Sequence, residues 1–327
     1  MPGRARHGPL PGRDAVTARG VKNIAASVRQ RLRNLAEQGP RPFDELLQRY
    51  AMERFLYRLS QSPYVDRFVL KGALMLAAWD APMSRPTKDI DLLGRTSNEV
   101  EAVEAIVRDV CRQEVEPDGI LFDADSVRGA RIKEDAEYSG VRVLLDGGLG
   151  VARVRVQVDV GFGDAIVPGA ADLEYPTLLD MPAPHLRGYS RESTVAEKIE
   201  AAVKLDLRNS RMRDLYDLWF LSRRFPFDGS TLAEAVRTAF ENRGTELVAE
   251  PTAFGTAFTG NPEKVVQWRS FVERTRATEA PGELAMVMEH VGAFLRPVLE
   301  ALVEGSRFDA SWQPGGPWSD RRRERSD

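Results

Sequence analysis

The sequence has few of the residues from which disulfide frameworks and zinc sites are built. It contains one cysteine, Cys111, and three histidines in 327 residues. A lone cysteine cannot form an internal disulfide, which suits a reducing compartment. So few thiol and imidazole ligands also argue against a zinc site. Cys111 follows an apolar, helix-like stretch, and we interpret it as a small buried hydrophobic residue.

Long apolar runs are lacking as well. No stretch approaches the roughly 20 apolar residues that a transmembrane helix needs, and the basic N-terminus lacks the apolar run of a secretory signal. We therefore expect a cytoplasmic protein with no membrane partner. The formal net charge is −3. Because the chain has no overall basic excess, any contact with RNA or DNA has to come from a local patch.

Composition and periodicity divide the chain into four parts. Residues 1–20 are rich in Gly and Pro and poor in large apolar side chains, which predicts a disordered basic tail. Residues 21–190 mix helical and strand patterns and predict an α/β domain; residues 191–303 are helical in pattern throughout. Residues 304–327 lose periodicity and are expected to form a disordered C-terminal tail. The predicted fold class is α+β, a mixed sheet with flanking helices followed by a helical domain.

The expected elements follow from apolar spacing and from the Gly and Pro residues that interrupt it. A hairpin turn is expected at Gly147-Gly148. Helices are expected at about 21–38, 46–59, 73–79, 98–114, 193–207, 212–224, 230–242, 260–277 and 281–303. Strands are expected at about 68–70, 86–93, 128–133, 141–145, 154–160 and 173–178.

The N-terminal segment is strongly basic. Residues 1–33 hold one acid, Asp14, and eight basic residues: Arg4, Arg6, Arg13, Arg19, Lys22, Arg29, Arg31 and Arg33. This composition is typical of an arm that contacts nucleic acid. A solvated, disordered tail without a partner is the explanation that we favour.

The most informative stretch is the strand expected at 86–93, which contains Asp89, Ile90, Asp91 and Leu92. Side chains alternate between the faces of a strand, so Asp89 and Asp91 point one way and Ile90 and Leu92 point into a core. Two carboxylates roughly 6.6 Å apart along a strand repel each other, and a bound divalent cation would offset that repulsion. A solvated edge strand is the alternative explanation.

A third carboxylate strengthens the metal interpretation. In residues 153–160 the valines share one face, and Asp159 lies on the other near the end of the strand. If this strand neighbours residues 86–93, Asp159 joins Asp89 and Asp91. Three such carboxylates suit a two-metal phosphoryl-transfer site, and oxygen ligands favour Mg²⁺ or Mn²⁺.

Four blocks together resemble a known family. They are residues 70–74 (LKGAL), 85–92 (RPTKDIDL), 196–198 (AEK) and 213–218 (RDLYDL). In order and spacing they are similar to the AbiEii/AbiGii-type toxins, a family that includes the MenT toxins and belongs to the DNA polymerase β nucleotidyltransferase superfamily. The superfamily commonly has Gly-Gly or Gly-Ser before the helix, whereas this chain has Gly72-Ala73. Backbone N–H groups at a helix start can still bind phosphate.

The resemblance implies roles for individual residues around the metal. Asp89 and Asp91 would hold Mg²⁺, and Asp159 matches the third carboxylate, which often activates the attacking hydroxyl. Gly72 would let the backbone approach a triphosphate, although a simple turn glycine explains it too. Lys71 is a further candidate for nucleotide binding.

The remaining implied roles concern the nucleotide. Lys198 would reach its phosphates, and Asp214 would orient Lys198 or assist the acceptor group. Arg85 would steady the nucleotide or pair with the aspartates. For Lys198 the alternative is a solvated lysine, and for Asp214 it is a helix cap, where an acid is favourable.

The function implied is that of a magnesium-dependent toxin of a toxin–antitoxin system. It would transfer nucleotides from an NTP to an RNA end, the tRNA 3′ acceptor end being the expected substrate, and a cognate antitoxin would be its partner. Other hypotheses are the same chemistry on a small molecule or protein, a non-catalytic nucleotide-binding module, and a two-metal nuclease. The nuclease gives no role to the Gly72 turn or to the lysine on a helix.

Overall fold

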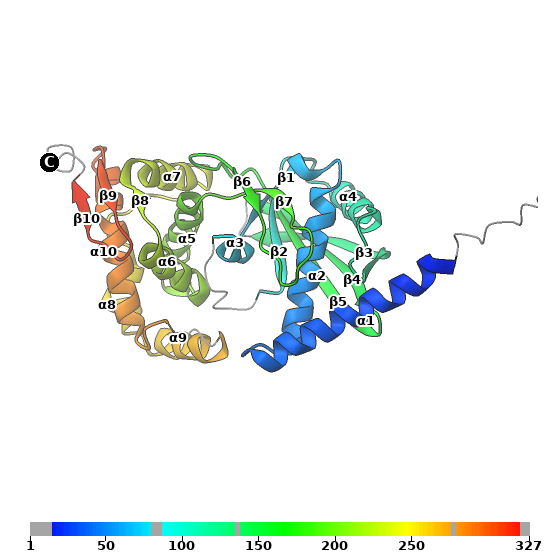
Figure 1. Ribbon diagram of the computed structural model, residues 1–327. Coiled ribbons are helices and arrows are strands. Elements are labelled where there is room, and N and C mark those ends of the chain that lie inside the picture. The colour runs from blue at the N-terminus through cyan, green and yellow to red at the C-terminus, as the bar shows by residue number, and fades with distance from the viewer. Residues whose placement is uncertain (1–14, 80–86, 135–137, 276–278, 321–327) are drawn as a thin grey trace, which may run out of the picture.

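The computed structural model describes residues 15–79, 87–134, 138–275 and 279–320 (Figure 1). Two groups of elements follow each other along the chain, a strand-rich group and a helical group. None of the helices in these ranges combines the length and the apolar content that a membrane span needs.

The strand-rich group contains one large sheet and the helices around it. Its helices are α1 (Ala15–Gln38), α2 (Phe43–Ser60), the 3₁₀ turn η1 (Val65–Arg67), α3 (Ala73–Ala78) and α4 (Val100–Arg112). Its strands are β1 (Phe68–Lys71), β2 (Asp89–Gly94), β3 (Ile120–Glu134), β4 (Tyr138–Leu149), β5 (Ala152–Phe162), β6 (Ala171–Glu174) and β7 (His185–Gly188).

The sheet has seven strands in the order β3-β4-β5-β2-β1-β7-β6. Pairs β2–β5 and β1–β7 are parallel, and the other neighbours are antiparallel. The predicted α+β class with a mixed sheet is therefore confirmed. The central position of β2 between β1 and β5 decides which side chains meet at the site.

One face of the sheet is covered by helices from the N-terminal half. Helix α2 lies against β5, α4 lies against β3 and β4, and α1 crosses α2 (Figure 1). The alternating valines of β5 are buried, with Val156 and Val160 fully inaccessible. Cys111 is buried on α4, as expected. Because apolar side chains fill this face and successive side chains of a strand alternate between faces, the polar side chains of β2 and β5 lie on the opposite face.

The helical group follows β7. Its elements are α5 (Arg191–Leu205), the 3₁₀ turn η2 (Asp206–Arg208), α6 (Met212–Arg224), β8 (Phe227–Asp228), α7 (Gly229–Asn242), the 3₁₀ turn η3 (Thr252–Phe254), α8 (Thr256–Thr259), α9 (Pro262–Thr275), α10 (Leu284–Val303), β9 (Ala310–Trp312) and β10 (Trp318–Asp320). The buried apolar side chains form two clusters. One spans Val28 to Tyr189, and the other is centred on α5, α6, α7 and α10 and includes Leu76 of α3 and Val167. The boundary between residues 190 and 191 remains our proposal for the division into domains.

Both predicted tails contain more structure than expected. Helix α1 begins at Ala15, within the segment expected to be a disordered tail, and residues 1–14 lie outside the described part. The prediction of a disordered tail from residue 304 is wrong as far as residue 320, since β9 and β10 form a three-stranded sheet with β8. Trp312 explains this: it is 2% exposed and its indole Nε1 donates to the Ser222 carbonyl at 2.6 Å.

Two smaller predictions also need correction. Gly147 and Gly148 lie inside β4, and the β4–β5 hairpin turns at Gly150 and Val151, between the paired residues Leu149 and Ala152. Gly150 has φ +63°, the conformation that favours glycine in a two-residue hairpin loop. The short strand expected at 173–178 lies at 171–174, and the strand β7 was not predicted.

Candidate functional site

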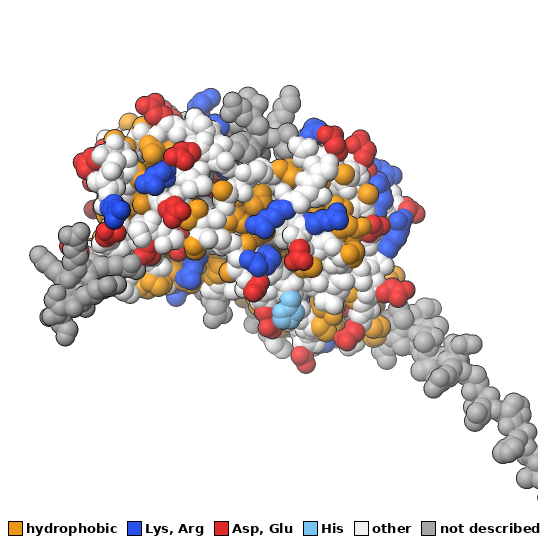
Figure 2. All heavy atoms as spheres, turned by 90° about the horizontal axis from the view of Figure 1, so that it is seen from above, with side chains coloured by type: hydrophobic (Ala, Val, Ile, Leu, Met, Phe, Trp, Pro, Cys, Tyr) orange, Lys and Arg blue, Asp and Glu red, His pale blue; other side chains and the backbone are white. Residues whose placement is uncertain are grey.

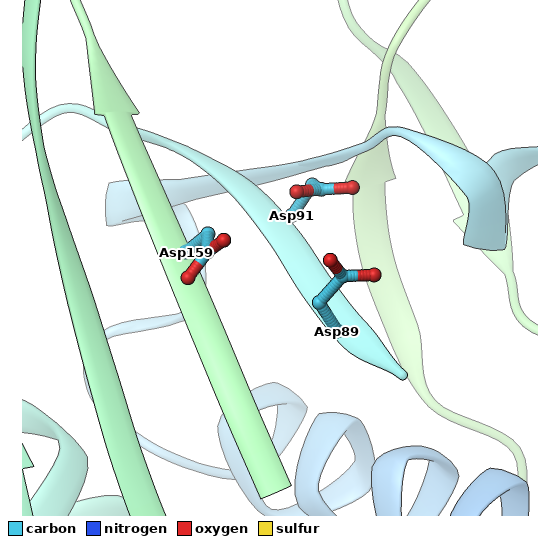
Figure 3. Close-up of side chains that lie close together, drawn as sticks. All are labelled: Asp89, Asp91 and Asp159. Carbon is cyan, nitrogen blue, oxygen red and sulfur yellow. The ribbon is translucent and has the colours of Figure 1, made fainter. Parts of the chain in front are cut away.

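Three carboxylates converge on the face of the sheet opposite α2. Asp89 and Asp91 belong to β2 and Asp159 to β5, and these parallel strands place Asp91 directly beside Asp159 (Figure 3). One carboxylate oxygen from each residue lies within 4.8 Å of the other two. Ile90 points to the other face and is fully buried. Strand alternation and the β2–β5 pairing together produce this cluster.

The three carboxylates have different surroundings. The Thr87 hydroxyl donates to Asp89 at 2.6 Å. Asp159 accepts two hydrogen bonds from the Arg142 guanidinium, at 2.9 and 2.7 Å, and one from Gln157 at 3.0 Å. Burial, and next the charge of Asp89, raise the pKa of Asp91 to about 7, although the positive charge of Lys71 acts in the opposite direction. Negative charge is therefore only partly compensated at Asp89 and Asp91.

This donor set fits a hard divalent cation. The cluster offers only carboxylate oxygens, the ligands that Mg²⁺ and Mn²⁺ prefer. A cation bound there would favour the ionised form of Asp91, whose pKa is raised by burial and by the charge of Asp89.

Gly72 lies against this cluster at the turn between β1 and α3. Its backbone has φ +70° and ψ −151°, a conformation that side chains rarely adopt. A Cβ on residue 72 would lie 2.0 Å from Oδ2 of Asp91 and 2.7 Å from its Cγ. Glycine is therefore required here both by the backbone angles and by the close approach of Asp91.

Lys198 and Asp214 are brought together by two helices of the second group. Ser190 caps α5, its hydroxyl accepting from the Ser193 N–H at 3.0 Å, and Lys198 lies two turns further along. Its Nζ contacts Asp214 at 2.6 Å and Asp217 at 3.0 Å, both on α6. The N-cap of α6 is residue 211, so Asp214 does not serve as the helix cap.

Asp217 was given no role in the sequence interpretation. Its side chain is only 2% exposed. The available signal was its spacing of three residues from Asp214, which puts both carboxylates on one side of α6.

Lys71 lies in a buried ionic cluster that joins the two groups of elements. Its Nζ is 2.7 Å from Asp164 and 3.2 Å from Glu197 on α5. Arg243, after α7, contacts the same two acids and Glu200. Burial by itself lowers the pKa of Lys71, but Glu197 and Asp164 raise it above its ordinary value. The cluster fixes α5, and with it Lys198, over the sheet.

A pocket opens beside the carboxylates, between the sheet and α5. Its lining includes Asp91, Asp159 and Gly161 from the sheet, and Ala201 and Lys204 from α5. Arg85, which was expected to contact the nucleotide or the aspartates, lies outside the described residues.

Comparisons with known proteins identify a family and similar solved structures. The family model described as "Nucleotidyl transferase AbiEii toxin, Type IV TA system" matches residues 54–304, more than half of the chain. Among solved structures, JHP933 from Helicobacter pylori is similar with a TM-score of 0.45 and 15% identity, over 80% of this chain and 95% of that one. A candidate nucleotidyltransferase from H. pylori is similar with a TM-score of 0.42 and 15% identity, over 80% and 98%. No curated protein matches the sequence.

Proposed function

The chain belongs to the AbiEii family of nucleotidyltransferase toxins of type IV toxin–antitoxin systems, and on that premise we propose that it is a Mg²⁺-dependent enzyme that transfers nucleotides from an NTP to the 3′ end of RNA. The proposed acceptor is the tRNA acceptor end, and Mn²⁺ could replace Mg²⁺ in the site. The observation that carries the proposal is the meeting of Asp89, Asp91 and Asp159 on β2 and β5.

The residues of the cluster have separate proposed tasks. Asp89 and Asp91 would hold the metal, and Asp159 would accept the proton of the attacking 3′-hydroxyl. A bound Mg²⁺ would offset the negative charge of the triphosphate. The 3′-oxygen would form a bond to the α-phosphorus in line with the bond to the β-phosphate oxygen, which would break and release pyrophosphate.

The nucleotide would lie on the side of Gly72 and Lys198. Lys198 would contact its phosphates, with Asp214 and Asp217 holding the lysine in place, and the glycine at 72 would let the backbone come close. Lys71 was also expected to contact the nucleotide. Because its Nζ is engaged by Asp164 and Glu197, we propose that it acts mainly by fixing α5.

Two observations favour RNA over a small acceptor. Residues 1–33 hold eight basic residues and one acid, and the family belongs to toxin–antitoxin systems. NTPs and tRNA are abundant in the cytoplasm, so the proposal places the enzyme there, with an antitoxin as the expected partner.

The direct test is to incubate the protein with Mg²⁺, total RNA and each of the four α-labelled NTPs in turn. We expect label from one or more NTPs to appear in the tRNA band and to disappear with EDTA. Label on a small molecule or on protein, with none on RNA, would contradict the proposed acceptor.

A further inference from the structure

The connection between α5 and α6 carries a local excess of positive charge. Residues 204–213 contain one acid, Asp206, and four basic residues, Lys204, Arg208, Arg211 and Arg213. The segment therefore has a formal charge of +4 − 1 = +3, in a chain of net charge −3. On the face shown in Figure 2, Lys and Arg side chains lie among Asp and Glu side chains. Residues 204–213, with four basic residues and one acid, differ from this mixed surface in their excess of positive charge.

These four cations have no acidic partner within the described part of the chain, whereas other cations near the carboxylates do. Lys71, Arg142 and Arg243 all form ion pairs. The side chains of Lys204 and Arg211, by contrast, are exposed. Their positive charge is available to an anion that comes from solution.

Two of the four cations face the site itself. Lys204 and Arg211 line the pocket that also contains Asp91 and Asp159. Among its described lining residues the pocket includes neither Gly72 nor Lys198. It therefore lies on the Asp159 side of the cluster, where the proposed mechanism puts the attacking hydroxyl, and not on the proposed triphosphate side.

The backbone of the connection is held in a defined shape. Asn209 is 1% exposed, and its side-chain oxygen accepts the Arg211 N–H at 2.8 Å. The Asn209 N–H donates to the Asp206 carbonyl at 3.0 Å. Asp206 itself has φ +50°, a conformation that non-glycine residues adopt only at a cost of free energy. The basic side chains therefore project from a preorganised segment.

We propose that the α5–α6 connection binds backbone phosphates of the acceptor RNA strand, with Lys204 and Arg211 nearest the reacting 3′ end and Arg208 and Arg213 further out. This inference rests on the proposed function, since it assigns the RNA to one side of the carboxylate cluster. Phosphate contacts position a strand without reading its sequence, so the connection sets the place of the RNA end and not its identity.

The test compares Lys204→Gln/Arg211→Gln with a matched control, Arg237→Gln/Arg307→Gln. Both double variants remove two positive charges, and the control residues are exposed and do not line the pocket. Binding of fluorescent tRNA is measured by anisotropy without NTP at several salt concentrations. Loss of two contacts to a single strand should reduce the slope of log K against log salt by about 1.4. Between about 50 and about 200 mM salt, the pocket variant should therefore lose about sevenfold less affinity than the wild type.

NTP affinity, measured by calorimetry, should be the same in both variants. A salt slope equal to the control's would overturn the inference. An unchanged RNA slope with weaker NTP binding would also overturn it, because the two cations would then serve the triphosphate. Label transfer distinguishes a failure of the proposed function from a failure of the inference about the α5–α6 connection. A wild type that binds tRNA but labels only another acceptor contradicts the proposed function; a pocket variant with the control's KM for tRNA contradicts this inference alone. A wild type that binds no RNA contradicts both.

Discussion

Replacing Gly72 by alanine tests whether the β1–α3 turn holds Asp91 in place. A Cβ at residue 72 would lie 2.0 Å from Asp91 Oδ2, and ordinary van der Waals contact begins at 3.4 Å. The carboxylate oxygen would have to retreat by 3.4 − 2.0 = 1.4 Å. Metal–ligand distances tolerate only about ±0.2 Å, and a misplacement of about 1 Å can lower a rate about 100-fold. We expect Gly72→Ala to reduce nucleotide transfer at least about 100-fold.

Gly305→Ala is a control for placing a side chain at a glycine of positive φ. Gly305 has φ +68°, close to the φ +70° of Gly72, but a Cβ there would meet nothing within 4 Å. The positive φ alone should lower the free energy of unfolding by about 1–2 kcal/mol and leave transfer unchanged. Both variants are assayed by thermal melting and by transfer of labelled NTP as a function of Mg²⁺ concentration.

A double-mutant cycle shows whether the clash with Asp91 is the cause. Asp91→Ala removes the two closest contacts and leaves the Asp91 Cβ at 2.8 Å, so Gly72→Ala/Asp91→Ala should recover part of the stability that Gly72→Ala loses. Gly72→Ala with wild-type Mg²⁺ dependence and wild-type transfer would refute the reasoning.

Three further predictions concern the charged groups. Lys198→Ala should weaken NTP binding by roughly 10–100-fold in calorimetry and also lower the melting temperature, since Asp217 is buried against Lys198. The double variant Lys198→Ala/Asp217→Asn should regain stability but not NTP affinity. Recovered NTP affinity in the double variant would contradict the role of Lys198 in nucleotide binding. Lys71→Met should lower the free energy of unfolding by about 3 kcal/mol, as expected when one partner of a buried ionic cluster is removed, with less than about tenfold loss of NTP affinity; the reverse pattern would make Lys71 a nucleotide ligand. Because the pKa of Asp91 is raised to about 7, the Mg²⁺ concentration for half-maximal binding should rise about tenfold for each pH unit below about 7 and level off above it. In the metal-free protein the same group binds its proton more tightly when folded than when unfolded, where its pKa is near 3.8. Its contribution to stability is therefore fully present below about pH 4 and lost as the pH rises to about 7. Melting curves of the wild type and of Asp91→Asn across this pH range would detect the contribution of Asp91. Identical pH profiles of stability for the two proteins would contradict the raised pKa of Asp91.

The convergence of the carboxylates could be predicted from the sequence because strand alternation is a local rule. Asp89 and Asp91 share a face by spacing, and the valines around Asp159 identify its face in the same way. The step that spacing could not supply was the pairing of β2 with β5, which joins residues far apart in the chain. That pairing was stated as a condition, and the structure fulfils it.

Other features depend on long-range contacts that no local pattern encodes. The partners of Lys71 include Glu197, and Arg243 completes that cluster. Each is an ordinary charged residue until the fold brings it close to the others. Strand β7 is short and follows two prolines, so its residues showed no period-two pattern of useful length. The order of residues 310–320 depends on Trp312 reaching the carbonyl of Ser222, which periodicity cannot detect.

The central claim is that the carboxylates of β2 hold the metal on which nucleotide transfer depends. The sequence offers a matched control, because Asp123 and Asp125 on β3 form a second Asp-x-Asp pair whose side chains are exposed. The decisive measurement compares transfer of labelled NTP to tRNA by Asp89→Asn/Asp91→Asn and by Asp123→Asn/Asp125→Asn, over a range of Mg²⁺ concentrations and with melting curves for both. We predict no transfer by the first variant at any Mg²⁺ concentration, with its fold retained, and wild-type transfer by the second. Transfer by Asp89→Asn/Asp91→Asn at the wild-type rate would contradict the account.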